Sequence, residues 1–117
     1  MQLSEFVEYL KSKRDYRQQI VHVERIPARA ARYASLKRPL PEVLHEALRQ
    51  AGVDKLYLHQ AEAINAIRDG QNVIVATSTA SGKTLVYNVP VLESILADGR
   101  SRALYLFPTK ALAQDQL

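Results

Sequence analysis

The sequence predicts an α/β fold, built on a parallel strand–helix–strand unit and preceded by a mainly helical arm. An apolar run, NVIVAT at 72–77, suits a strand buried on both faces, and a helical pattern follows it at 82–99. A second apolar run, RALYLFP at 102–108, precedes a further helix start at 109–117. This order indicates two parallel strands joined by a right-handed crossover.

Two helices are expected before the first of these strands. The segment 41–52 begins with Pro41, which suits the first helical position, and it carries an apolar stripe on one face. The segment 58–70 places Ile64 and Ile67 inward. Each segment ends on a glycine, the residue that most often follows a helix. Pro90 is expected to kink or interrupt the later helix at 82–99.

The first forty residues form a predicted arm. Residues 3–13 have helical spacing, with Ser4 as the candidate cap, and residues 18–26 are rich enough in β-branched side chains for a short strand. Three prolines then indicate an extended connector. We therefore divide the chain into a basic arm, 1–40, and an incomplete α/β domain, 41–117. The domain is expected to be incomplete because two parallel strands alone leave both faces and both edges uncovered.

Composition excludes several classes of site and of location. The 117 residues contain no cysteine, so disulfides, thiolate zinc sites and cysteine nucleophiles are absent. No secretory signal and no apolar run long enough to cross a membrane is visible. A cytoplasmic protein without a membrane partner is the expectation, and its oligomeric state is left open.

The net charge of +4 is concentrated in the first half of the chain. Residues 1–50 hold ten Lys and Arg against six Asp and Glu, whereas residues 51–117 hold six of each. This excess is either a solvated face or a patch that meets a phosphate backbone, and charge alone leaves both interpretations open.

The segment TSTASGKT, 77–84, carries the clearest chemistry. It lies between a predicted strand and a predicted helix, where backbone N–H groups and the helix dipole favour phosphate. Lys83 would reach the β and γ phosphates, and the Thr84 hydroxyl would ligate Mg²⁺. A strict phosphate loop has glycine at position 77, but Thr77 is there, and Ala80 stands where many loops have another glycine. We expect a loop in which only Gly82 needs special backbone freedom, with negative φ at Thr77 and Ala80.

The same residues resemble motif I of the superfamily 2 helicases, the DEAD/DEAH-box group. LYLHQAEAI at 56–64 resembles the region around their adenine-reading glutamine, and FPTKALAQDQL at 107–117 resembles motif Ia. The wider wording is similar to the RecQ-like helicases of mitomycin and crosslink repair. The resemblance covers about residues 20–117 and implies part of a RecA-like P-loop domain.

The resemblance implies ATP and Mg²⁺ as cofactors and single-stranded DNA as a partner. Gln60 would read the adenine edge, and Tyr57 would stack on the base or border it. Motif Ia would place three residues on the DNA strand: Pro108, Thr109 and Lys110. The phosphates would be held by the residues of motif I: Thr77, Ser78, Thr79, Ala80, Ser81, Gly82, Lys83 and Thr84.

The resemblance also implies what the chain lacks. Helicases of this group use an acidic pair on a later strand and arginines of a second domain, and no Asp-Glu pair occurs here. Lys83 would stabilise phosphate, but no general base accompanies it. We therefore expect an N-terminal fragment of an ATP-dependent DNA helicase that neither hydrolyses ATP nor unwinds DNA alone. Two alternatives stay open: a stand-alone nucleic-acid-binding module without ATPase activity, and a P-loop NTPase or kinase of another kind.

Overall fold

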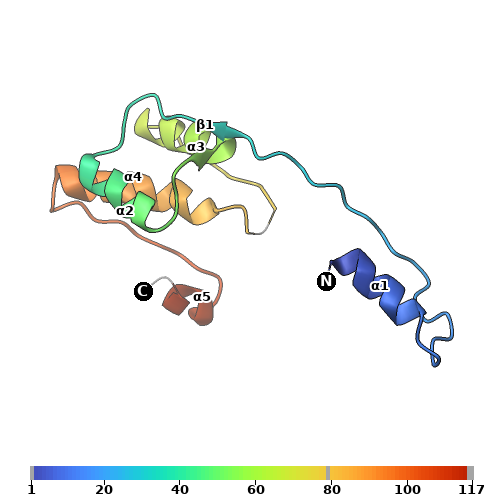
Figure 1. Ribbon diagram of the computed structural model, residues 1–117. Helices are drawn as coiled ribbons and strands as arrows, with labels where there is room; N and C mark the ends of the chain where they lie inside the picture. Colours follow the sequence, from blue (N-terminus) through green and yellow to red (C-terminus); the bar gives the residue numbers. More distant parts are fainter. Residues whose placement is uncertain (1, 79, 116–117) are drawn as a thin grey trace. The chain divides into compact units, whose positions relative to one another are not determined.

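Two compact units make up the chain, Met1–Ala30 and Ala31–Leu117. The computed structural model describes residues 2–78 and 80–115 (Figure 1). Its regular structure is mostly helical, with two short strands. Within the described ranges, no helix has the length and apolar character that a bilayer crossing requires.

The first unit contains helix α1, Leu3–Lys11. Gln2 precedes it, and the Gln2 N–H donates to Glu5 Oε2 at 2.9 Å. The predicted cap, Ser4, is wrong because Ser4 lies inside the helix. The predicted strand at 18–26 is also wrong, since these residues form no regular secondary structure and pair with no strand in the described part of the chain. A lone strand has no ladder of hydrogen bonds to stabilise it, and Val21 is left 93% exposed.

The second unit begins with a two-stranded antiparallel ribbon. Strand β1, Tyr33–Ala34, pairs with β2, Leu56–Tyr57, so that Tyr33 lies opposite Tyr57 and Ala34 opposite Leu56. The Leu58 N–H donates to the Arg32 carbonyl at 2.8 Å and continues the pairing. This ribbon was not predicted, because two residues are too few to show an alternating pattern. It ties the segment before α2, Glu42–Gln50, to the start of α3, Leu58–Arg68.

Three helices pack together in this unit, as predicted: α2, Glu42–Gln50, α3, Leu58–Arg68, and α4, Lys83–Ala97. Gly52 and Gly70 follow α2 and α3 with φ of 81° and 78°, which is the left-handed region that glycine tolerates. Helix α4 continues through Pro90 without interruption. The core is small and consists of Leu44, Leu56, Ala61, Ile64 and Val89.

The predicted parallel strands at 72–77 and 102–108 are wrong. In the described part of the chain, the sheet consists of β1 and β2 alone. Both segments are drawn as coil in Figure 1. Ile74 is 96% exposed, and Leu104 and Leu106 are each 84% exposed. A strand that is buried on both faces needs neighbours on both edges and helices above and below, and this unit supplies neither.

Side chains hold the second of these segments against α4. The Tyr105 hydroxyl donates to Asn88 Oδ1 at 3.1 Å. The Tyr105 ring meets the Tyr87 ring edge-on, with centroids 5.6 Å apart, and stacks on Phe107. Helix α5, Lys110–Asp115, follows. Helix α4 is therefore formed between the segments 72–77 and 102–108, but these two segments do not pair as strands.

Arg68 fastens α3 to α4 and to the segment that precedes α2. Its Nε donates to Glu93 Oε2 at 3.1 Å, and its Nη2 donates to Glu93 Oε1. Its Nη1 donates to the Arg38 carbonyl at 2.6 Å. The two paired side chains are only 8% and 18% exposed, so water screens this ion pair poorly.

Replacing Arg68 by Met should lower the free energy of unfolding by about 3 kcal/mol, because Glu93 would stay buried without its partner. Chemical denaturation measures this change. The control is Arg49→Met, which removes an exposed pair with Glu46 on α2 and should change the free energy of unfolding far less, because water screens that pair. Equal effects of the two substitutions would contradict the structural role of Arg68.

Candidate nucleotide site

The loop between α3 and α4 folds around the ammonium group of Lys83. Lys83 begins α4, and its Nζ donates to the carbonyls of Thr77 and Ser78 at 2.9 and 2.7 Å. Ser81 Oγ lies 3.4 Å from this nitrogen and 2.6 Å from Thr77 Oγ1. Among the described residues, no carboxylate pairs with Lys83. The loop therefore presents an uncompensated positive charge at the N-terminus of a fifteen-residue helix.

This arrangement suits a phosphate group. Neutral carbonyls solvate the ammonium but do not neutralise it, so an anion gains a full charge–charge attraction there. Thr84 is exposed on the first turn of α4. Thr79, which was predicted to belong to the same cradle, lies outside the described residues.

The side chains that the structure describes do not form a metal site by themselves. Residues 2–78 and 80–115 hold no group of three or more His, Cys, Asp and Glu side chains that could bind one. The Thr84 hydroxyl is the one predicted Mg²⁺ ligand of this loop. Mg²⁺ commonly takes further oxygens from nucleotide phosphates and water. The residues thus fit Mg²⁺ bound together with a nucleotide and do not form an independent metal site.

Gln60 connects the start of α3 to the start of α4. Its side chain is almost fully buried, at 2% exposure. Its Oε1 accepts the Tyr57 N–H at 2.9 Å, and its Nε2 donates to the Gly82 carbonyl at 2.9 Å. Both ends of the amide are therefore engaged with the protein backbone. The sequence pattern identified Gln60 but did not show this bond to the loop.

Gly82 is required at its position for two separate reasons. Its φ of 76° lies in the left-handed region. In addition, a Cβ built on Gly82 would lie 2.5 Å from Gln60 Nε2, inside contact distance. The prediction that Gly82 needs backbone freedom is confirmed.

The expectation of negative φ at Ala80 is wrong. Ala80 has a φ of 58°, so the described residues of the segment 77–84 include a left-handed alanine as well as the left-handed Gly82. The physical reason is the tight turn that brings Ser81 back to Thr77 and Lys83 back to the carbonyls of Thr77 and Ser78. Such a conformation costs about 1–2 kcal/mol for an alanine. The loop hydrogen bonds offset this strain.

A stack of rings adjoins the loop. The Tyr33 and Tyr57 rings lie 5.3 Å apart at 13°, and the Tyr57 and His59 rings lie 5.9 Å apart at 8°. His59 Nε2 donates to the Ser81 carbonyl at 3.0 Å. Tyr57 thus has two ring partners already, so bordering an adenine is the arrangement that its surroundings favour. Tyr33 was missed, because only the β1–β2 register brings it to this stack.

The residues of motif Ia lie at the start of α5. The Thr109 hydroxyl accepts the Leu112 N–H at 3.3 Å, and the Thr109 carbonyl accepts the Ala113 N–H at 3.2 Å, so Thr109 caps this helix. Pro108 and Lys110 are exposed. These bonds stay at the start of α5, whereas Gln60 bonds the phosphate loop directly and Tyr57 stacks on His59, which bonds it.

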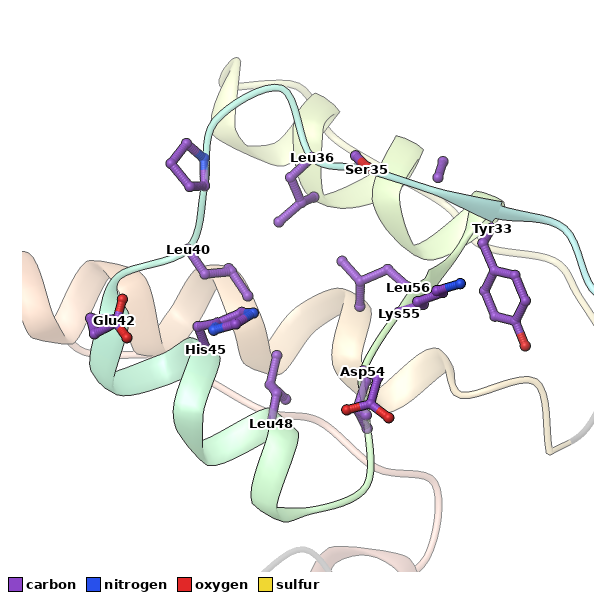
Figure 2. Close-up of a pocket in the computed structure, with 13 residues that line it drawn as sticks. Tyr33, Ser35, Leu36, Leu40, Glu42, His45, Leu48, Asp54, Lys55 and Leu56 are labelled. Carbon is purple, nitrogen blue, oxygen red and sulfur yellow. The ribbon is translucent and has the colours of Figure 1, made fainter.

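A separate hollow of about 660 Å³ opens beside α2. Figure 2 shows its leucines around the hollow, from the segment after β1, from α2 and from β2, with the polar side chains of Glu42, His45, Asp54 and Lys55 among them. Four leucines line it: Leu36, Leu40, Leu48 and Leu56. No residue of the predicted nucleotide site lines this hollow.

Replacing Gly82 by Ala should destabilise the chain more than the same change at Gly70. Both glycines have similar positive φ, but a Cβ at Gly70 meets nothing within 4 Å. The backbone cost of about 1 kcal/mol is therefore shared, and contact with Gln60 adds about 1–3 kcal/mol at Gly82 alone. Thermal and chemical unfolding measure the difference. In a Gln60→Ala background, the difference in stability between Gly82→Ala and Gly70→Ala should disappear. An unchanged difference would contradict the assigned contact.

Comparison with known proteins relates this geometry to one group of enzymes. The family model for DEAD/DEAH box helicases matches residues 57–117. The ATP-dependent helicase hrq1 of Schizosaccharomyces pombe is 45% identical over an alignment of 117 positions that covers 97% of this chain and 11% of that protein. The uncharacterized ATP-dependent helicase YprA of Bacillus subtilis is 55% identical over 83 residues, 68% of this chain and 11% of that protein. The chain thus spans about a tenth of the length of these curated relatives.

The same comparison extends to a solved structure. The crystal structure of the DUF1998 helicase MrfA bound to DNA and AMPPNP superposes with a TM-score of 0.81 at 43% identity. It covers 99% of this chain and 16% of that chain. The three-helix unit and its loops therefore have the architecture of part of a helicase, although the parallel pairing is not formed here.

Proposed function

Because the chain belongs to the DEAD/DEAH box helicase family, we propose that its phosphate loop binds ATP as part of an ATP-dependent DNA helicase. The membership confirms the resemblance seen in the three sequence motifs. The observation that carries the proposal is the Lys83 ammonium, which backbone carbonyls hold at a helix N-terminus and which no carboxylate of residues 2–78 and 80–115 neutralises. A triphosphate supplies the charge that this position lacks.

Binding would exchange one set of Lys83 contacts for another. The ammonium leaves the carbonyls of Thr77 and Ser78 and turns to the β and γ phosphate oxygens. The loop N–H groups and the dipole of α4 add to the attraction. Mg²⁺, when bound with the nucleotide, neutralises phosphate charge, and the Thr84 hydroxyl is the ligand that this chain offers it. The related MrfA structure contains AMPPNP, which supports a nucleotide at the corresponding loop.

Gln60 has spare capacity for adenine. Its amide oxygen accepts two hydrogen bonds and its nitrogen donates two, and the structure uses one of each. We propose that the side chain, which is 2% exposed in this structure, opens toward the loop so that the remaining pair reads the adenine edge while the existing bond to Gly82 persists. Tyr57 would border the base.

Pro108, Thr109 and Lys110 are proposed to contact a DNA strand. Lys110 is exposed and would meet a phosphate, while Thr109 keeps the start of α5 in place. The related MrfA structure is bound to DNA, which supports this partner class. Residues 72–77 and 102–108 would be strands of a RecA-like sheet once neighbouring strands cover them, with residues 1–40 as a lead-in to that domain.

Turnover by this chain alone should be negligible. Positioning and charge neutralisation supply most phosphoryl-transfer catalysis, and the chain has no Asp-Glu pair to hold Mg²⁺ or orient water. Lys83 would contribute phosphate binding without an accompanying general base. The chain is thus proposed to bind nucleotide and DNA weakly, and catalysis to need further parts of a helicase.

A fluorescent ATP analogue with Mg²⁺ should bind the chain, and Lys83→Ala should weaken binding by about 10-fold or more, since one charge-assisted contact is lost. Thr84→Ser, which keeps the hydroxyl, is the matched control and should bind like the wild type. An adenine nucleotide should compete better than a guanine nucleotide, and phosphate release should stay at background with or without single-stranded DNA.

Other outcomes would overturn parts of this proposal. A preference for guanine would exclude the adenine role of Gln60. Robust ATP turnover that Lys83→Ala abolishes would refute the expectation of negligible catalysis. Binding of DNA without any Lys83-dependent nucleotide binding would favour the stand-alone nucleic-acid-binding module.

The Lys110→Gln variant should bind single-stranded DNA more weakly, and the slope of log affinity against log salt should fall by about 0.7, the value for one phosphate contact. Fluorescence anisotropy of a labelled oligonucleotide measures both quantities. Arg102→Gln removes an equal charge from an exposed position outside the motif and should leave the slope unchanged. Equal effects of both variants would indicate a response to net charge only.

A further inference from the structure

The geometry points to Tyr33 as a positioning residue for the phosphate loop, acting through Tyr57 and His59. This inference rests on the proposed nucleotide site and adds to it a residue from the segment before α2. Within the described residues, Tyr33 makes its ring contacts with Tyr57 and Lys55 and not with the loop, so its influence would pass along the ring stack.

The stack begins on the β1–β2 ribbon. Register places Tyr33 opposite Tyr57, and their rings are nearly parallel at 5.3 Å. These rings are 52% and 40% exposed, so burial alone does not fix their rotamers. Stacking across the strands does, with Lys55 Nζ 5.7 Å from the Tyr33 ring centroid as a cation–π partner.

The stack ends on the loop backbone. His59 is nearly parallel to Tyr57, and its Nε2 lies 3.0 Å from the Ser81 carbonyl oxygen. A carbonyl only accepts, so Nε2 must carry the hydrogen. Neutral imidazole in that tautomer and imidazolium both satisfy this bond. The orientation of the ring, which Tyr57 sets, therefore decides whether the bond forms.

Ser81 connects the His59 hydrogen bond to the ammonium group of Lys83. Its carbonyl is held by His59, while its hydroxyl lies 2.6 Å from Thr77 Oγ1 and 3.4 Å from Lys83 Nζ. A change in the direction of the Ser81 peptide moves that hydroxyl and the turn at Ala80. Removing the Tyr33 ring would thus loosen the phosphate cradle without touching it.

Nucleotide binding by the full chain tests this coupling. Tyr33→Leu should weaken binding of the fluorescent ATP analogue by about 3- to 10-fold, an ordinary coupling between residues in one network. Tyr33→Phe keeps the ring and should stay within about 2-fold of the wild type. His59→Phe keeps the stack but loses the bond to Ser81, and it should weaken binding as much as Tyr33→Leu without disturbing the ribbon.

A double-mutant cycle shows whether the effect of Tyr33 on nucleotide binding depends on His59 or comes from a general loss of stability. In a His59→Leu background, Tyr33→Leu should have an effect below about 2-fold, because the path to Ser81 is already broken. Additive effects, or an unchanged affinity in Tyr33→Leu, would overturn the inference. Failure of Lys83→Ala to weaken binding would overturn the proposed nucleotide site instead.

The coupling between Tyr33 and the loop can also be measured in the absence of nucleotide. Nitrogen NMR of the full chain should show hydrogen on His59 Nε2. The amide resonances of Ser81 and Gly82 should shift in Tyr33→Leu and stay in place in Tyr33→Phe. Unshifted Ser81 and Gly82 resonances in Tyr33→Leu would overturn the inference whether or not the chain binds ATP.

Discussion

A buried amide, that of Gln60, fixes the geometry on which the phosphate loop depends. Its oxygen holds the backbone where β2 passes into α3, and its nitrogen holds the carbonyl of Gly82 where the loop passes into α4. The starts of the two helices are thereby set relative to each other. Because the side chain is 2% exposed, losing either partner would leave a polar group without solvent to replace it. The same contact forbids a side chain at position 82, so Gln60 and Gly82 constrain each other.

The loop that this amide positions has a strained backbone at Ala80 and the positive charge of Lys83 inside its turn. Ala80 occupies the left-handed region, and the ammonium of Lys83 is gathered inside the turn by the carbonyls of Thr77 and Ser78. Strain in such loops persists only where surrounding bonds over-determine the backbone. Here those bonds come from Gln60 and His59 of α3 and from the lysine itself. An anion that takes over the lysine would remove part of this network, so binding and loop conformation are coupled.

Local patterns predicted the helices and the loop well, and long-range pairing poorly. The glycine ends of α2 and α3, the start of α4 near Gly82 and the Lys83–Thr84 pair all follow from neighbouring residues. The strands at 72–77 and 102–108 did not form, since pairing depends on partners far away in sequence. The negative φ expected for Ala80 failed for a related reason: the folding back of Lys83, invisible in residue spacing, decides the turn. Tyr33 escaped notice because a two-residue strand leaves no periodic signal.

The two unpaired segments, 72–77 and 102–108, show the same alternation of strongly exposed and less exposed side chains. Residues 102–108 keep Tyr105 and Phe107 on the α4 side through ring contacts and a hydroxyl bond, while Leu104 and Leu106 face outward. This is the two-residue alternation of a strand whose one face is already seated. Residues 72–77 expose Ile74 in the same manner, with Val73 and Val75 partly covered. Each segment alternates between strongly exposed and less exposed side chains, and in the described part of the chain neither has the backbone pairing that would cover its outward side chains. Contacts from α3, together with the ring stack that begins on the β1–β2 ribbon, hold the backbone of the phosphate loop. In the described part of the chain, this loop geometry forms without paired strands at 72–77 and 102–108.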